Sequence, residues 1–201
     1  WFNDGQKKRE RFFTNGERDS VWTTWYENGN KKLLATYSKG KLNGRYTSWY
    51  KDGIIKEKHG NYLNNKKDNK WTYWSNKGQK IEEVNYNNGI HNGAHIQWFD
   101  DKSDQHKKFH INYKDGKKDG SWHYWYSTGI DSIQSNYKND VKDGHWIWWR
   151  SNGLKDKEGH FKNEKKHGVW TVWNDSTGNA YHKLHQETFV NGAIDGKVTK
   201  W

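Results

Sequence analysis

The sequence contains no cysteine, no proline and no methionine among its 201 residues. Without cysteine the chain forms neither a disulfide nor a thiolate metal site. A ladder of paired strands excludes proline from most of its positions, so the missing proline fits such a ladder. No stretch is apolar enough to cross a membrane, and no signal peptide is visible. The sequence leaves the cellular location undecided between the cell surface or exterior and the cytoplasm, and we prefer the cell surface.

Apolar residues are also scarce, because they make up only 30% of the chain against about 45–50% in typical globular proteins. More than half of that small share is aromatic, since Phe, Trp and Tyr account for 17% of all residues. Disordered chains are poor in aromatic residues. The composition therefore predicts an ordered protein built from thin, partly exposed layers rather than around a deep core.

Charge of one sign dominates: Lys plus Arg is 35 and Asp plus Glu is 24, which gives a net charge of +11. A basic surface attracts anions: nucleic acid, an anionic lipid, an acidic polysaccharide or an acidic protein. The alternative is that the charge only keeps a tryptophan-rich surface soluble, because the basic residues are spread along the chain and form no block.

A repeat covers the whole chain, and its modal step is 24 residues (for example 49 − 25 = 24). One column of the repeat, counting the chain ends, is Trp1, Trp25, Trp49, Trp74, Trp98, Trp125, Trp149, Trp173 and Trp201. Three residues earlier stands a second column, with Trp22, Tyr46, Trp71, His95, Trp122, Trp146, Trp170 and Val198. Only Trp148 lies outside both tryptophan columns. Two residues before the second column a small residue recurs: Ser20, Gly44, Asn69, Gly93, Gly120, Gly144, Gly168 and Gly196.

Each repeat is expected to be a β-hairpin, with a Trp/Tyr/Thr-rich first strand such as WTTWY, a turn such as ENG, and a second strand such as KLLATY. The recurring small residues are predicted to be turn glycines with positive φ. The two tryptophan columns, three residues apart, should face opposite sides of the sheet. The expected fold is all-β: an elongated, solenoid-like, single-layer antiparallel sheet of about eight tandem hairpins, forming one array over residues 1–201.

The segments DGSWHYWYSTG with SNYKND, and DGHWIWWRSNG with GHFKNE, resemble the MORN repeat, in particular the bacterial variant of YwqK-type antitoxins. The resemblance covers essentially the whole chain. It implies a twisted single-layer sheet of hairpins that associates with a protein or a membrane. The sequence departs from the repeat at Ser20, Asn69, His95 and Val198, and we expect local irregularities in those repeats.

No nucleotide-binding, metalloprotease or hydrolase motif occurs, so we expect no catalytic residue, no cofactor and no enzyme activity. Three histidine pairs are weighed as metal ligands: His91 and His95 flank Asn92-Gly93 and could meet across a hairpin, His106 and His110 would lie too far apart along one strand, and His182 and His185 would face opposite sides. We expect no metal site, because histidines in a polar sheet are more often solvated or stacked. Stacked tryptophans on a basic sheet could also bind nucleic acid or sugars. Strict recurrence favours a structural role for both columns, and we do not expect nucleic acid as a partner.

The preferred function is therefore a scaffold that binds a protein partner and resembles antitoxin or immunity proteins. One alternative is a subunit of a surface assembly or filament that self-associates through open sheet ends, and another is adhesion to anionic lipid or polysaccharide. Because Trp1 and Trp201 share a column, we expect the chain to be part of a longer protein. The longer steps after Trp98 and Trp173 predict insertions at hairpin tips.

Overall fold

The computed structural model describes residues 1–100, 105–174 and 181–201, and the regular structure in these ranges is β-strand. In these ranges no helix is long and apolar enough to cross a membrane. The chain divides into two compact units, Trp1–Gln105 and His106–Trp201. The predicted insertions after Trp98 and Trp173 centre on segments 101–104 and 175–180, which lie outside the described residues.

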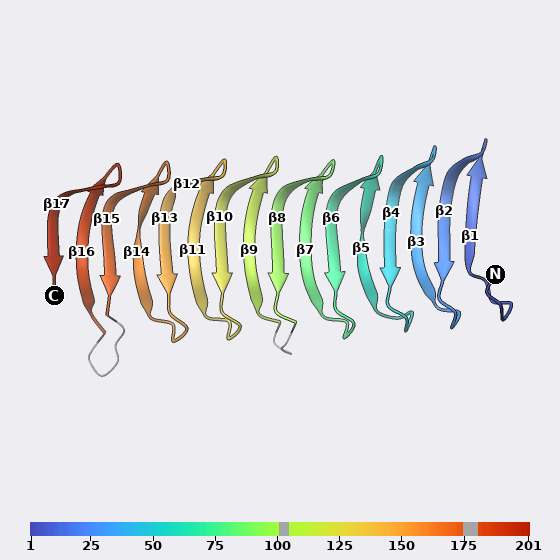
Figure 1. The fold of residues 1–201 in the computed structure, drawn as a ribbon, viewed down its shortest axis with the longest axis horizontal. Helices are drawn as coiled ribbons and strands as arrows, with labels where there is room; N and C mark the ends of the chain where they lie inside the picture. The colour runs from blue at the N-terminus through green and yellow to red at the C-terminus, as the bar shows by residue number, and fades with distance from the viewer. Residues whose placement is uncertain (101–104, 175–180) are drawn as a thin grey trace. The chain divides into compact units, whose positions relative to one another are not determined.

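Unit 1 is a single layer of strands in which each strand pairs antiparallel with the next one along the chain (Figure 1). Its strands are β1 (Arg9–Thr14), β2 (Glu17–Trp25), β3 (Lys31–Ser38), β4 (Lys41–Trp49), β5 (Lys56–Leu63), β6 (Lys66–Trp74), β7 (Lys80–Asn87) and β8 (Ile90–Trp98).

Unit 2 repeats this arrangement, again with antiparallel pairing between chain neighbours. Its strands are β9 (Lys107–Lys114), β10 (Lys117–Trp125), β11 (Asp131–Lys138), β12 (Val141–Lys142), β13 (Gly144–Trp149), β14 (Lys155–Lys162), β15 (Lys165–Trp173), β16 (Lys183–Val190) and β17 (Ala193–Lys200). The predicted all-β architecture of consecutive hairpins is therefore confirmed.

Two kinds of connection alternate along each unit. After each second strand, a tight turn of two residues with positive φ leads back, as at Asp115 (49°) and Gly116 (82°). Positive φ at both central residues defines the type I′ turn, whose twist matches that of paired strands. Where the structure describes the connection after a first strand, it is a longer loop; in the loop after β2 the Tyr26 amide donates to the Asn30 carbonyl (2.8 Å) and Gly29 has a φ of 82°. This loop is the ENG turn that the sequence predicted.

The small-residue column has positive φ, from 57° at Asn69 to 111° at Gly44. The structure nevertheless places these residues in strands rather than in turns. Gly44, Gly93, Gly120, Gly168 and Gly196 lie within β4, β8, β10, β15 and β17, and Gly144 begins β13. Near them the pairing shifts register, as between Lys118 and Trp122 of β10. They are therefore bulge residues, and the bulge gives each hairpin a fixed register.

The two tryptophan columns face opposite sides, as strand alternation predicts. We call the column of Trp22, Trp71, Trp122, Trp146 and Trp170 the inner column, because these five rings are buried. Each inner indole N–H donates to the carbonyl ten residues earlier, as from Trp71 to Asn61 (2.9 Å). We call the other set the outer column; it comprises the half-buried Trp25, Trp49, Trp74, Trp98, Trp125, Trp149 and Trp173.

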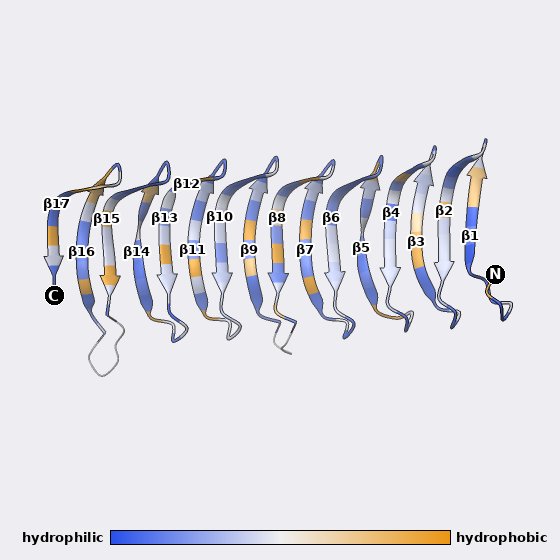
Figure 2. Ribbon diagram, in the orientation of Figure 1, coloured by the Kyte–Doolittle hydropathy of each residue, from blue (hydrophilic) through white to orange (hydrophobic). Residues whose placement is uncertain are grey.

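Buried apolar residues outside the inner column are few: Ala35, Val84, Ile111 and Phe189. Most strands are hydrophilic along much of their length, and the hydrophobic segments stay isolated (Figure 2). Rings therefore supply most of the packing. The hydroxyl of Tyr26 adds a link between repeats, because it donates to the Trp49 carbonyl (2.8 Å), and Tyr50 does the same to Trp74 (2.8 Å).

Candidate functional site

One row of side chains changes its chemistry from repeat to repeat, while the columns beside it are mostly aromatic. The row lies on the inner-column face, two residues after each inner-column position, and includes the cross-strand partners. In unit 1 it consists of Arg9, Thr24, Leu33, Ser48, Lys58, Tyr73, Glu82 and Gln97. Because the hairpin does not require one residue type here, this variable row is the natural place for function.

In unit 2 the variable row is apolar over four neighbouring strands. Phe109, Tyr124, Ile133 and Trp148 are cross-strand neighbours on β9, β10, β11 and β13. We call these four residues the apolar strip. All four are half-buried. The rings of Phe109 and Tyr124 lie 5.9 Å apart between centroids.

Trp148 is fixed at the end of the apolar strip by its neighbours. Its ring lies 5.4 Å from Trp146 and 5.9 Å from Trp170 between centroids, so it rests on the inner column. The ammonium of Lys157 stands 5.1 Å from the same ring. A hollow of about 220 Å³ opens beside Trp148 and Val172. Burial raises the pKa of Tyr124, and the neighbouring Tyr137 and Tyr113 add to the shift.

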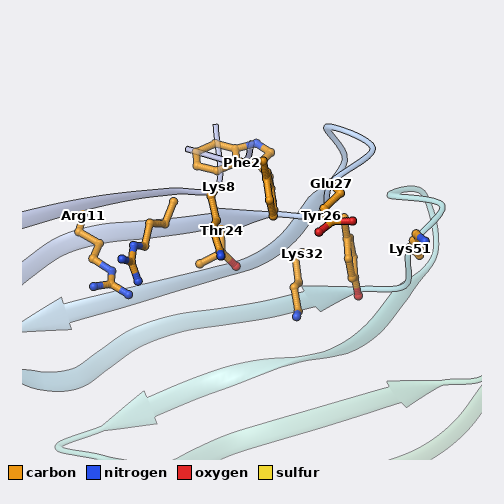
Figure 3. A pocket seen from close by; sticks show the side chains of 10 residues that line it. Phe2, Lys8, Arg11, Thr24, Tyr26, Glu27, Lys32 and Lys51 are labelled. Atoms are coloured by element: carbon orange, nitrogen blue, oxygen red, sulfur yellow. The ribbon is translucent and has the colours of Figure 1, made fainter. Parts of the chain in front are cut away.

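In unit 1 the start of the variable row opens into a hollow of about 450 Å³ (Figure 3). Five cationic side chains line it: Lys8, Arg9, Arg11, Lys32 and Lys51. Three rings also line it, those of Phe2, Trp25 and Tyr26, together with one carboxylate, Glu27. We call this site the basic hollow. Its volume lies within the range of about 300–1,000 Å³ that is usual for small-ligand sites.

A histidine cluster on the outer-column face of unit 2 was missed by the sequence interpretation. His110 pairs with His123 across β9 and β10, and His145 pairs with His160 across β13 and β14. His123 Nε2 lies 2.7 Å from Asp131 Oδ1. Burial lowers the pKa of His110 and of His145, with nearby histidines and lysines adding to the shift. Part of the signal was available, because His123 and His145 are adjacent in sequence to the inner tryptophans Trp122 and Trp146 and therefore point to the opposite face. The placement of His110 and His160 on that face depends on the cross-strand register.

The pair that the sequence weighed as a metal site, His91 and His95, lies on β8 around the bulge at Gly93 rather than across a turn. Their ring centroids are 5.5 Å apart, and His95 Nε2 lies 2.6 Å from Glu82 Oε1. Among residues 1–100, 105–174 and 181–201, no group of three or more His, Asp or Glu side chains is placed to hold a metal ion.

No protein-family model matches this chain, and no curated protein matches it. The structure by itself shows an antiparallel hairpin-repeat protein. The finer identification as a MORN repeat, and the function that goes with it, are therefore matters for proposal.

Proposed function

We propose that this protein is a non-enzymatic repeat scaffold that binds a protein partner through the apolar strip of unit 2. The observation that carries the proposal is the change in chemistry along one row. At positions that are mostly polar in unit 1, unit 2 presents Phe109, Tyr124, Ile133 and Trp148 next to one another. Tyr and Trp are enriched at protein interfaces and at their energetic centres.

The charge around the strip indicates what kind of partner would fit. Lys157 lies over Trp148, and the hollow beside that ring is also lined by Lys166 and His185, with Glu187 as its one carboxylate. The whole chain carries +11. An acidic partner surface with an apolar centre would complement this rim and would be steered toward it.

The non-enzymatic part of the proposal is supported by where the paired titratable groups lie. His123 and Asp131 have 27% and 37% of their side chains exposed on an open sheet face. Acid–base catalysis gains most of its power in sites that exclude water. We also propose that the repeats are MORN-like, as the resemblance of their sequence pattern suggests, and that the protein acts in the manner of the antitoxin-like scaffolds of that group.

The test is co-purification from the source cells, followed by calorimetry with the recovered partner. The wild-type chain is expected to recover one partner at a stoichiometric ratio. Tyr124→Ser/Trp148→Ser should weaken binding by at least about tenfold, because it removes two central rings. The matched control is Val169→Ser, since Val169 is 48% exposed and is not part of the strip. Unchanged affinity of the double variant, or equal loss in the control, would contradict the proposal.

A further inference from the structure

The basic hollow of unit 1 concentrates unpaired positive charge. None of its five cations forms an ion pair with a carboxylate of the described residues. The lysine one position before Lys8 is paired, because Lys7 lies 2.8 Å from Glu10, and the lysines at the same position of later repeats are paired likewise, Lys80 with Glu83 (2.9 Å) and Lys155 with Glu158 (2.9 Å). Unpaired cations that share one hollow repel one another, so a bound anion would relieve that repulsion.

The hollow is not a feature that the repeat produces everywhere. Lys8 lies 5.3 Å from the Phe2 ring, and Lys32 lies 5.3 Å from the Tyr26 ring, in the same arrangement one repeat later. At the equivalent position the later repeats have Glu57, Ile81, Lys108, Ser132, Asp156 and Leu184. Lys8 and Lys32 are therefore the one case in the sequence in which two consecutive repeats both have a cation at this position.

Arginine is concentrated here as well. Arg9 and Arg11 are two of the five arginines in the chain. Arg11 stands where the next repeats have the buried Ala35 and Gly60, and its guanidinium lies 4.9 Å from the Trp22 ring. A guanidinium offers a planar fork of donors that suits carboxylate and sulfate oxygens.

The walls of the hollow are held in place before any ligand arrives. The Tyr26 hydroxyl is bound to the Trp49 carbonyl (2.8 Å), which fixes the ring. The loop after β2 is tied to the next loop, because Asn28 Nδ2 donates to the Lys51 carbonyl (2.8 Å) and Asn30 Nδ2 donates to the Asp52 carbonyl (2.8 Å). Such preorganisation lowers the cost of binding.

We propose that the basic hollow binds an acidic oligosaccharide, a sugar chain that carries carboxylate or sulfate groups. The arginines and lysines would bind the anionic groups. The rings of Phe2 and Trp25 would pack against the C–H faces of the pyranose rings. The Glu27 carboxylate and the Thr24 hydroxyl would bind sugar hydroxyls. Glu27 also distinguishes this ligand from a phosphate backbone, because a phosphodiester has no donor to offer a carboxylate.

The experiment is calorimetric titration of the full chain with a heparin-derived oligosaccharide, with a neutral cello-oligosaccharide of equal length as the reference ligand. Arg9→Ala/Arg11→Ala should weaken binding by at least about tenfold, since it removes two charge-assisted contacts. Lys41→Ala/Arg45→Ala removes the same charge outside the hollow and should weaken binding by less than about threefold. Phe2→Leu should weaken oligosaccharide binding and leave the much weaker binding of inorganic sulfate unchanged.

Three results would overturn the proposal. The first is equal weakening by the two double variants, which would mean attraction by diffuse surface charge. The second is binding of inorganic phosphate, oligothymidine or phosphatidylserine vesicles as tight as that of the oligosaccharide. The third is no oligosaccharide binding by the wild-type chain together with aggregation of Arg9→Ala/Arg11→Ala, which would mean that these arginines only keep β1 from pairing with other chains.

Discussion

The inner and outer columns should contribute unequally to stability, and Trp71 and Trp74 on β6 give the sharpest comparison. Trp71 is 0% exposed. Its ring lies 4.9 Å from Tyr62 and 5.7 Å from Tyr46 between centroids. Trp74 is half-buried on the opposite face, with the ammonium of Lys56 at 5.8 Å.

Trp71→Ala is expected to lower the free energy of unfolding by about 3–5 kcal/mol, the usual cost of removing a fully buried Trp or Phe. Gly60 lies directly beneath the ring and has no side chain to fill the space. The Asn61 carbonyl loses its indole donor but belongs to an exposed residue, so water can replace that donor. Trp74→Ala should cost about half as much, because part of its area is already in water.

The assay is urea denaturation of the full chain, followed by far-ultraviolet circular dichroism so that fifteen tryptophans do not confuse the signal. Trp74→Ala serves as the internal control, because it deletes the same atoms from the same strand. Equal losses for the two variants, or a loss below about 1 kcal/mol for Trp71→Ala, would refute the assignment of the inner column as the core.

Other consequences can be measured in the same way. Gly60→Ala should destabilise by about 1–3 kcal/mol through overpacking, because a Cβ would lie 2.4 Å from Trp71 Cδ2; a stabilised variant in denaturant melts would show that the ring moves freely. Gly120→Val should destabilise more than Gly120→Asn, because Gly120 has a φ of 88° and Asn tolerates positive φ better than a β-branched residue; equal melting temperatures would contradict the bulge. Burial lowers the folded-state pKa of four histidines, His59, His91, His110 and His145. Protonation therefore favours the unfolded chain, and the melting temperature should fall as the pH falls through about 6.5. A melting temperature that stays constant from pH 7.5 to 5.5 would contradict this prediction.

The sequence was sufficient to predict the hairpin ladder, because the two columns and the spacing of glycines recur in register. It was not sufficient to separate turns from bulges. In KDGKKDG both Gly116 and Gly120 follow aspartate, and both have positive φ. Only the neighbouring Asp115 distinguishes the turn, because its own φ is 49°. Local composition does not encode that difference, since it depends on how β9 and β10 pair.

The candidate sites were harder to find from sequence than the fold. Tyr124 and Trp148 belong to a sequence full of rings, and their grouping with Phe109 and Ile133 depends on cross-strand register. One signal was present, because Trp148 is the tryptophan outside both columns. Likewise, Arg11 occupies the repeat position at which the next repeats have Ala35 and Gly60. An arginine there stands out only once the structure shows that this position is buried in those repeats.

Pairing between chain neighbours also has a consequence for how the protein is made. Within each unit, every described strand pairs with strands that lie within roughly one repeat of sequence, so this pairing does not depend on a distant segment. Chains rich in local contacts fold quickly, and domains fold as they leave the ribosome. Within each unit, a hairpin can therefore dock on its predecessor during synthesis, and the growing edge supplies the template for the next strand. A pause in translation would leave a shorter ladder rather than a misfolded one.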